Sequence, residues 1–98
     1  MTTKEVLEAA KKRIEDPVNW GQGAKYKYGV VRPGTECAME AVGRVLEPDV
    51  RRSPHTTAGY QQAENALKAA MGESPVYFND DHTHAEVMEA FDRAIEAL

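Results

Sequence analysis

The sequence predicts a mainly α-helical fold: a single domain over residues 1–98, with three to four helices and a short two-stranded β-ribbon. Three observations lead to this prediction. Apolar residues recur at helical spacing in several stretches of the chain. Residues that typically start or end helices flank these stretches. Finally, 98 residues that are 42% hydrophobic and 29% charged suffice for one folded core but not for two.

The first helix is predicted over residues 2–15. Thr2 and Glu5 have the spacing of a capping box, and Pro17 ends the helix because the residue before a proline is pushed out of the α region. One face of this helix carries four apolar residues: Val6, Leu7, Ala10 and Ile14.

A long segment, residues 18–34, follows this helix and holds Trp20 and four of the seven glycines. The alternation at residues 25–28 (Lys-Tyr-Lys-Tyr) is typical of a strand, and residues 76–78 (Val-Tyr-Phe) form a second strand-like run that could pair with it. These two runs are the predicted β-ribbon. Because so long a connection is unusual in a small domain, we expect it to pack through Trp20 and to carry function.

Three further helices are predicted, from residue 35 or 36 to 46, over 57–71 and over 84–98. Thr35 is the expected N-cap of the first, Gly72 closes the second, and Thr83 with Glu86 forms a capping box for the third. The expected inward-facing residues are Ala38, Ala41, Val42, Val45 and Leu46, then Tyr60, Ala63, Leu67 and Ala70 or Met71, then Val87, Phe91, Ala94, Ile95 and Leu98.

Charge and composition argue against several classes of function. The net charge is −4 and there is no basic stripe, so we expect no nucleic-acid partner. No apolar run approaches the ~18 residues of a membrane span, so we expect no membrane partner. The N-terminal residues lack the apolar core of a secretory signal, which favours the cytoplasm. The single cysteine, Cys37, excludes an internal disulfide and a multi-cysteine zinc site.

Several motifs resemble those of a known family. They are Trp-Gly-Gln-Gly-Ala at residues 20–24, Cys-Ala at 37–38, Phe-Asn-Asp at 78–80, Thr-His-Ala-Glu-Val at 83–87 and Phe-Asp-Arg-Ala-Ile at 91–95. In this order, and over nearly the whole chain, the sequence is similar to a family of small uncharacterised domains of actinobacteria and their phages. The family often has Trp in place of Phe78 and Leu-Gly in place of Met39 and Glu40. The resemblance implies a mostly helical fold and no established activity, cofactor or catalytic residue.

Cys37 is a candidate nucleophile. It lies at a predicted helix start, where the helix dipole would favour the thiolate. His82 or His84 could then serve as its base, with Asn79 as the orienting residue. The competing interpretation is a small buried hydrophobic residue, which most free cysteines are. We favour the inert, buried thiol.

The segment around residues 80–86 also has two interpretations. Its potential metal ligands are Asp80, Asp81, His82, His84 and Glu86. Their spacing matches neither a helical His-x-x-x-His zinc site nor a calcium-binding loop. An Asx-turn followed by the capping box explains the same residues, so we expect no metal and no cofactor.

Glycines next to Trp20 would let the backbone approach a ligand closely. A small-ligand or metal-binding site there would use Trp20, Gln22, Asn79 and Asp80. Packing of Trp20 against the helices, with its ring N–H bonded to a carbonyl, is the favoured alternative.

The function that the sequence favours is a non-enzymatic module that binds a protein partner, of actinobacterial or phage origin. The alternatives are a thiol hydrolase built on Cys37 with His82 or His84, and the small-ligand or metal-binding domain at Trp20. Self-association of the chain is compatible with the same sequence.

Overall fold

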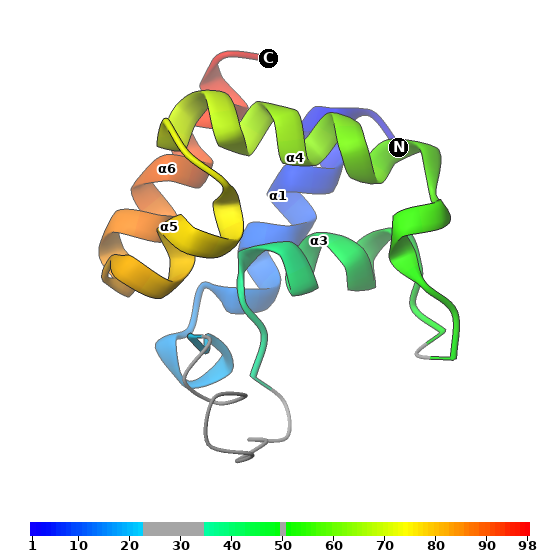
Figure 1. Ribbon diagram of the computed structural model, residues 1–98, viewed down its shortest axis with the longest axis horizontal. Helices are drawn as coiled ribbons and strands as arrows, with labels where there is room; N and C mark the ends of the chain where they lie inside the picture. Colours follow the sequence, from blue (N-terminus) through cyan, green and yellow to red (C-terminus); the bar gives the residue numbers. More distant parts are fainter. Residues whose placement is uncertain (23–34, 50) are drawn as a thin grey trace.

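The computed structural model describes residues 1–22, 35–49 and 51–98. These residues form five α-helices and two short 3₁₀ helices (Figure 1). In chain order they are α1 (Thr3–Ile14), η1 (Pro17–Asn19), α3 (Ala38–Leu46), η2 (Pro54–Thr56), α4 (Ala58–Met71), α5 (Pro75–Asp81) and α6 (His84–Glu96). None of these helices is both long and apolar enough to cross a membrane.

Helix α1 is the centre of the fold and packs against α3, α4 and α6 (Figure 1). Its predicted inner face is confirmed, because Val6, Leu7, Ala10 and Ile14 are all buried. Phe91 of α6 is the largest of the fully buried side chains. Much of the remaining core consists of alanine, whose small side chain lets neighbouring helices approach closely: Ala38, Ala41, Ala63, Ala90 and Ala94.

The predicted helix ends are confirmed at three places. Thr2 and Thr83 are N-caps, and each forms a capping box with the glutamate three residues later. In the second box the Thr83 Oγ1 accepts from the backbone N–H of Glu86 at 3.2 Å, while Glu86 Oε1 accepts from the backbone N–H of Thr83 at 3.0 Å. Gly72 ends α4 with φ at +77°, a left-handed conformation that glycine adopts without steric cost.

The predicted β-ribbon is wrong. Residues 76–78 belong to helix α5, and residues 25–28 lie outside the described part of the chain. Pro75 occupies the first turn of α5, and the residues at helical spacing from it, Phe78 and Asn79, are buried. Burial therefore follows a helical period here, whereas a strand would have placed Val76 and Phe78 on one face. The described residues contain an isolated parallel bridge between Trp20 and Glu36 but no strand.

Two helix ends also differ from the prediction. Helix α3 begins at Ala38, so its N-cap is Cys37 and the prediction of Thr35 is wrong. Glu40 Oε1 accepts from the backbone N–H of Cys37 at 3.0 Å, which satisfies a donor at this helix start. At the C-terminus α6 ends at Glu96, and Leu98 beyond it is 54% exposed instead of buried.

Candidate functional site

Asn79 joins three separate segments of the chain. Its side chain is fully buried. Its Oδ1 accepts from the ring N–H of Trp20 at 2.8 Å and from the backbone N–H of Ala38 at 3.0 Å. Its Nδ2 donates to the carbonyl oxygen of Gly21 at 3.0 Å. One amide thus ties α5 both to the start of α3 and to the segment that follows η1.

Gln22 closes the end of α5 in a similar way. Its Nε2 donates to the carbonyl oxygens of Asn79, Asp80 and His82 at 3.3, 3.2 and 2.9 Å. The last carbonyls of a helix have no partner within the helix, so this side chain supplies one. The structure therefore brings together Trp20, Gln22, Asn79 and Asp80, the four residues of the predicted ligand site. The side-chain amides and the indole N–H of this group are engaged in binding other parts of the protein.

His82 and His84 also serve packing. The His82 ring stacks on Phe78 with the centroids 3.7 Å apart, and its Nδ1 lies 2.9 Å from the Phe78 carbonyl oxygen. The Nε2 of His84 lies 2.7 Å from the carbonyl oxygen of Ile14, and its ring meets Trp20 edge-on. A carbonyl oxygen only accepts, so the contacting nitrogen carries the hydrogen in both rings. Among the described residues, no group of three or more His, Cys, Asp or Glu could hold a metal ion.

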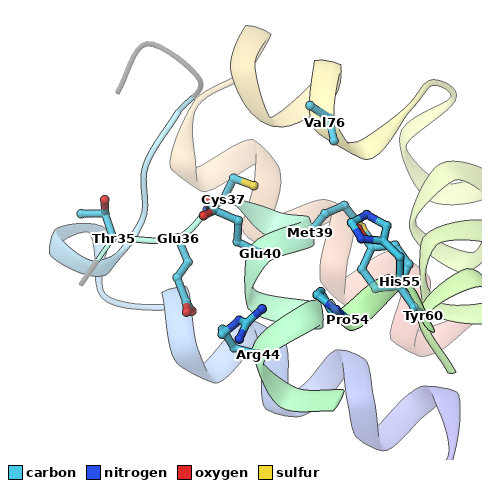
Figure 2. A pocket seen from close by; sticks show the side chains of 10 residues that line it. All are labelled: Thr35, Glu36, Cys37, Met39, Glu40, Arg44, Pro54, His55, Tyr60 and Val76. Atoms are coloured by element: carbon cyan, nitrogen blue, oxygen red, sulfur yellow. Dashed lines mark hydrogen bonds between the residues drawn. The ribbon is translucent and has the colours of Figure 1, made fainter. Parts of the chain in front are cut away.

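A further candidate site is a cavity that Cys37 helps to line. It has a volume of about 580 Å³ and lies between α3, η2, α4 and α5. In Figure 2, Val76 projects from α5 on one side of it, and Arg44 and Pro54 lie across from Val76. The lining combines apolar and polar side chains, among them Cys37, Met39, Arg44, Pro54, Tyr60 and Val76.

The environment of the Cys37 thiol in this wall favours its protonated form. The pKa of the thiol is raised to about 11, chiefly by burial; backbone hydrogen bonds at Glu40 and Met39 act in the lowering direction, and the Glu40 carboxylate acts in the raising direction. The thiol therefore stays protonated at neutral pH. The histidine of the cavity wall is His55, whose ring packs on Tyr60 with centroids 4.5 Å apart and whose Nδ1 lies 3.2 Å from the Ser53 hydroxyl. His82 and His84, the predicted bases, are not among the residues of this wall.

Arg44 has the most unusual environment in the cavity wall. Its Nη1 is buried and has no hydrogen-bond partner among the residues that the structure describes. Buried polar groups in folded proteins nearly always have a partner, and an unpaired one calls for an explanation. Among the described residues, this guanidinium nitrogen therefore has unused capacity to donate a hydrogen bond.

Three carboxylates near Arg44 in the sequence, those of Glu36, Glu47 and Asp49, have donors elsewhere. The Glu36 carboxylate accepts hydrogen bonds from Nε and Nη2 of Arg13, each at 2.8 Å. Glu47 accepts from the backbone N–H of Asp49 at 3.1 Å, and Asp49 in turn binds Arg51 at 3.0 Å. Arg44 is close enough to help lower the pKa of Asp49, although Arg51 is the larger cause of that shift.

Sequence reasoning missed Arg44 and Tyr60 as site residues, and it missed the contact that shapes the cavity. A Cβ at position 43 would lie 2.8 Å from Pro54 Cγ, so Gly43 lets η2 approach α3 closely. A glycine inside a predicted helix is the sequence signal that could have indicated this contact.

Comparisons with known proteins place the chain in a family without an assigned activity. Neither the curated proteins nor the solved structures include a match to this sequence. A family model described as "Family of unknown function (DUF6197)" matches residues 1–97. That match covers all but one residue, and the chain therefore belongs to this family of unknown function, DUF6197.

Proposed function

We propose that this protein is a small non-enzymatic interaction module, and that a segment of a protein partner enters the cavity between α3 and α5. The observation that carries the proposal is the cavity itself. Its volume of about 580 Å³ lies within the range of roughly 300 to 1,000 Å³ that is typical of pockets for small molecules, and side chains of a partner segment can occupy a space of this size.

The residues of the cavity favour a protein partner. Met39, Arg44 and Tyr60 belong to the residue types that are enriched at protein interfaces. Val76 of this wall is 45% exposed, and Tyr77, the next residue of α5, is 67% exposed. Exposed apolar residues next to a cavity are typical of a surface that another protein covers.

The chemistry of the wall supports binding over catalysis. A thiol hydrolase needs a thiolate, and burial keeps the pKa of Cys37 near 11. The similarity to domains of actinobacteria and their phages supports an accessory protein from one of these sources, acting in the bacterial cytoplasm. The net charge of −4 supports a protein partner over a nucleic acid.

Site-specific photo-crosslinking tests this proposal. A benzophenone amino acid would replace Val76 at the rim, and the protein would be irradiated in the lysate of an actinobacterium. Val18 is the matched control, because it is also apolar and is 78% exposed but does not line the cavity. We expect a discrete crosslinked protein from position 76 that is absent from position 18. The same set of products from both positions, or no product from position 76, would contradict the proposal.

A further inference from the structure

We propose that the segment bound in the cavity carries a carboxylate that binds Arg44, next to an apolar side chain. This inference rests on the proposed function and adds the chemistry of the partner. It follows from two observations, the unpaired guanidinium nitrogen and the apolar residues that surround it.

Arg44 has a guanidinium nitrogen that can donate a further hydrogen bond. Its Nη1 is buried without a partner among the described residues, and the side chain forms part of the cavity wall. The residue as a whole is half-buried. A partly desolvated cation is stabilised when an acceptor reaches it, because the interaction is stronger in less polar surroundings than in water. A partner that brings an acceptor into the cavity would therefore gain binding energy at this position.

The acidic side chains in the wall around Arg44 already accept hydrogen bonds from other groups of the protein. The Glu36 carboxylate in the same wall is held at both oxygens by Arg13, at 2.8 Å each. Glu40 binds the backbone N–H of Cys37 at 3.0 Å, at the positive end of α3. Cys37 itself is a neutral thiol, so it neither binds the guanidinium as an anion nor repels an entering carboxylate.

The shape of the guanidinium favours one type of acceptor. A guanidinium presents its N–H groups as a planar fork, which a carboxylate matches with two parallel hydrogen bonds. A neutral amide or hydroxyl would fill one direction of this fork and leave its charge uncompensated. An aspartate or glutamate side chain of the partner segment is therefore the best match.

The apolar part of the cavity wall favours one type of neighbouring residue in the partner. Met39, Pro54 and Tyr60 present apolar surface in the same cavity, with Val76 opposite (Figure 2). An apolar side chain beside the acidic one would fill this space and exclude water from the ion pair. The expected recognition element is thus an acidic residue adjacent to a large apolar residue.

Selection from a library of displayed random peptides, whose ends are blocked, tests the inference. The library would be selected separately on the wild-type protein, on Arg44→Met and on Arg93→Met. Arg93 is the matched control, because it also lies on a helix, but it is exposed and binds Glu89 at 3.0 Å. Thermal melting of each variant shows that it is folded before selection.

We expect peptides selected on wild type and on Arg93→Met to be enriched in Asp or Glu next to an apolar residue. Selection on Arg44→Met should lose this acidic preference and keep the apolar one. For one selected peptide, exchanging its acid for the matching amide should weaken binding to wild type about tenfold. The same exchange should have little effect on binding to Arg44→Met.

The other outcomes separate the two proposals. If the enriched peptides show no acidic preference but still crosslink to position 76, the proposed role of Arg44 is overturned and the interaction module stands. An acidic preference that persists on Arg44→Met would have the same meaning. No enriched peptide on the folded wild-type protein would contradict both this inference and the proposed function.

Discussion

Two polar side chains at helix α3, Asn79 before its start and Arg44 within it, each place a hydrogen-bonding atom in the interior, and they differ in whether that atom has a partner. Before the helix begins, the Asn79 side chain accepts from Trp20 and Ala38 and donates to Gly21. Further along the helix, Arg44 has a buried nitrogen without a partner among the described residues. The first group is closed and holds the fold together. The second has a donor without a partner among the described residues, and we propose that a partner protein supplies the acceptor.

The comparison shows how polar residues can be sorted without knowledge of function. A polar group that has exchanged its water contacts for contacts with the protein contributes to stability. A buried group that has lost water and gained no partner costs about 1 to 3 kcal/mol, and more if it is charged. Evolution can retain such a cost where binding recovers it, which is the pattern of a functional residue.

Asn79→Ala is the strongest test of the closed group. It leaves the Trp20 N–H, the Ala38 N–H and the Gly21 carbonyl without their buried partner. We expect a loss of about 3 kcal/mol or more in the free energy of unfolding, measured with urea. Asn65→Ala, at an exposed position of α4, is the control and should change it by less than about 0.5 kcal/mol. Similar, small losses for both variants would show that the Asn79 bonds do not carry the fold.

The capping box at α6 should have a smaller effect, because it is exposed. Thr83→Ala removes the acceptor for the Glu86 N–H and should lower the free energy of unfolding by about 0.5 to 2 kcal/mol. Glu86→Ala should also destabilise, and the two losses should not add because they remove one reciprocal unit. A double-mutant cycle in urea measures this. Strictly additive losses would contradict the capping box.

The same box predicts a pH dependence. Hydrogen bonds from the Thr83 backbone N–H and hydroxyl lower the pKa of Glu86 below its ordinary value of 4.5. Because the folded-state pKa is the lower one, the stabilisation is fully present above pH 4.5 and is lost as the pH falls through the folded-state pKa. Urea unfolding of wild type and Glu86→Gln between pH 7 and pH 3 should show a smaller acid-induced loss in the variant. Parallel curves would count against this linkage.

Arg44→Met should have the opposite sign to Asn79→Ala. It removes a buried nitrogen that has no partner among the described residues and leaves an apolar side chain of similar length, so the free energy of unfolding should stay the same or rise by about 1 kcal/mol. Thermal and urea unfolding measure this without any partner present. A marked loss of stability would mean that Arg44 supports the fold, as Asn79 does.

The smallest expected effect is the slow alkylation of Cys37, whose thiol lies in the cavity wall and should stay protonated. With its pKa near 11, alkylation by iodoacetamide should be slow at pH 7 and should keep rising with pH up to pH 10. The urea-unfolded protein, with a thiol pKa of about 8.5, is the control and should react faster. A rate in the native protein that levels off near neutral pH would revive the thiol hydrolase.

Sequence reasoning succeeded where structure is local. The inner face of α1, the capping boxes at Thr2 and Thr83, and the end of α4 at Gly72 depend on residues within about one turn of each other. It failed at α5, which has only seven residues, too few for a period to be recognised. The β-branched and aromatic run at 76–78 has strand propensity, but the contacts of Asn79 with Trp20 and Ala38 occur in a helix.

The sequence by itself predicted a mainly helical fold, and it named Trp20, Gln22, Asn79 and Asp80 as a candidate ligand site, with packing of Trp20 against the helices as the favoured alternative. Only the tertiary structure decided what these residues do, because the hydrogen-bond partners of Trp20, Gln22 and Asn79 lie 41 to 60 residues away in the chain. The cavity has the same dependence, since α3, η2, α4 and α5 each contribute to its wall. Periodicity and caps are short-range properties, whereas whether a buried arginine nitrogen has a partner depends on how distant helices pack together.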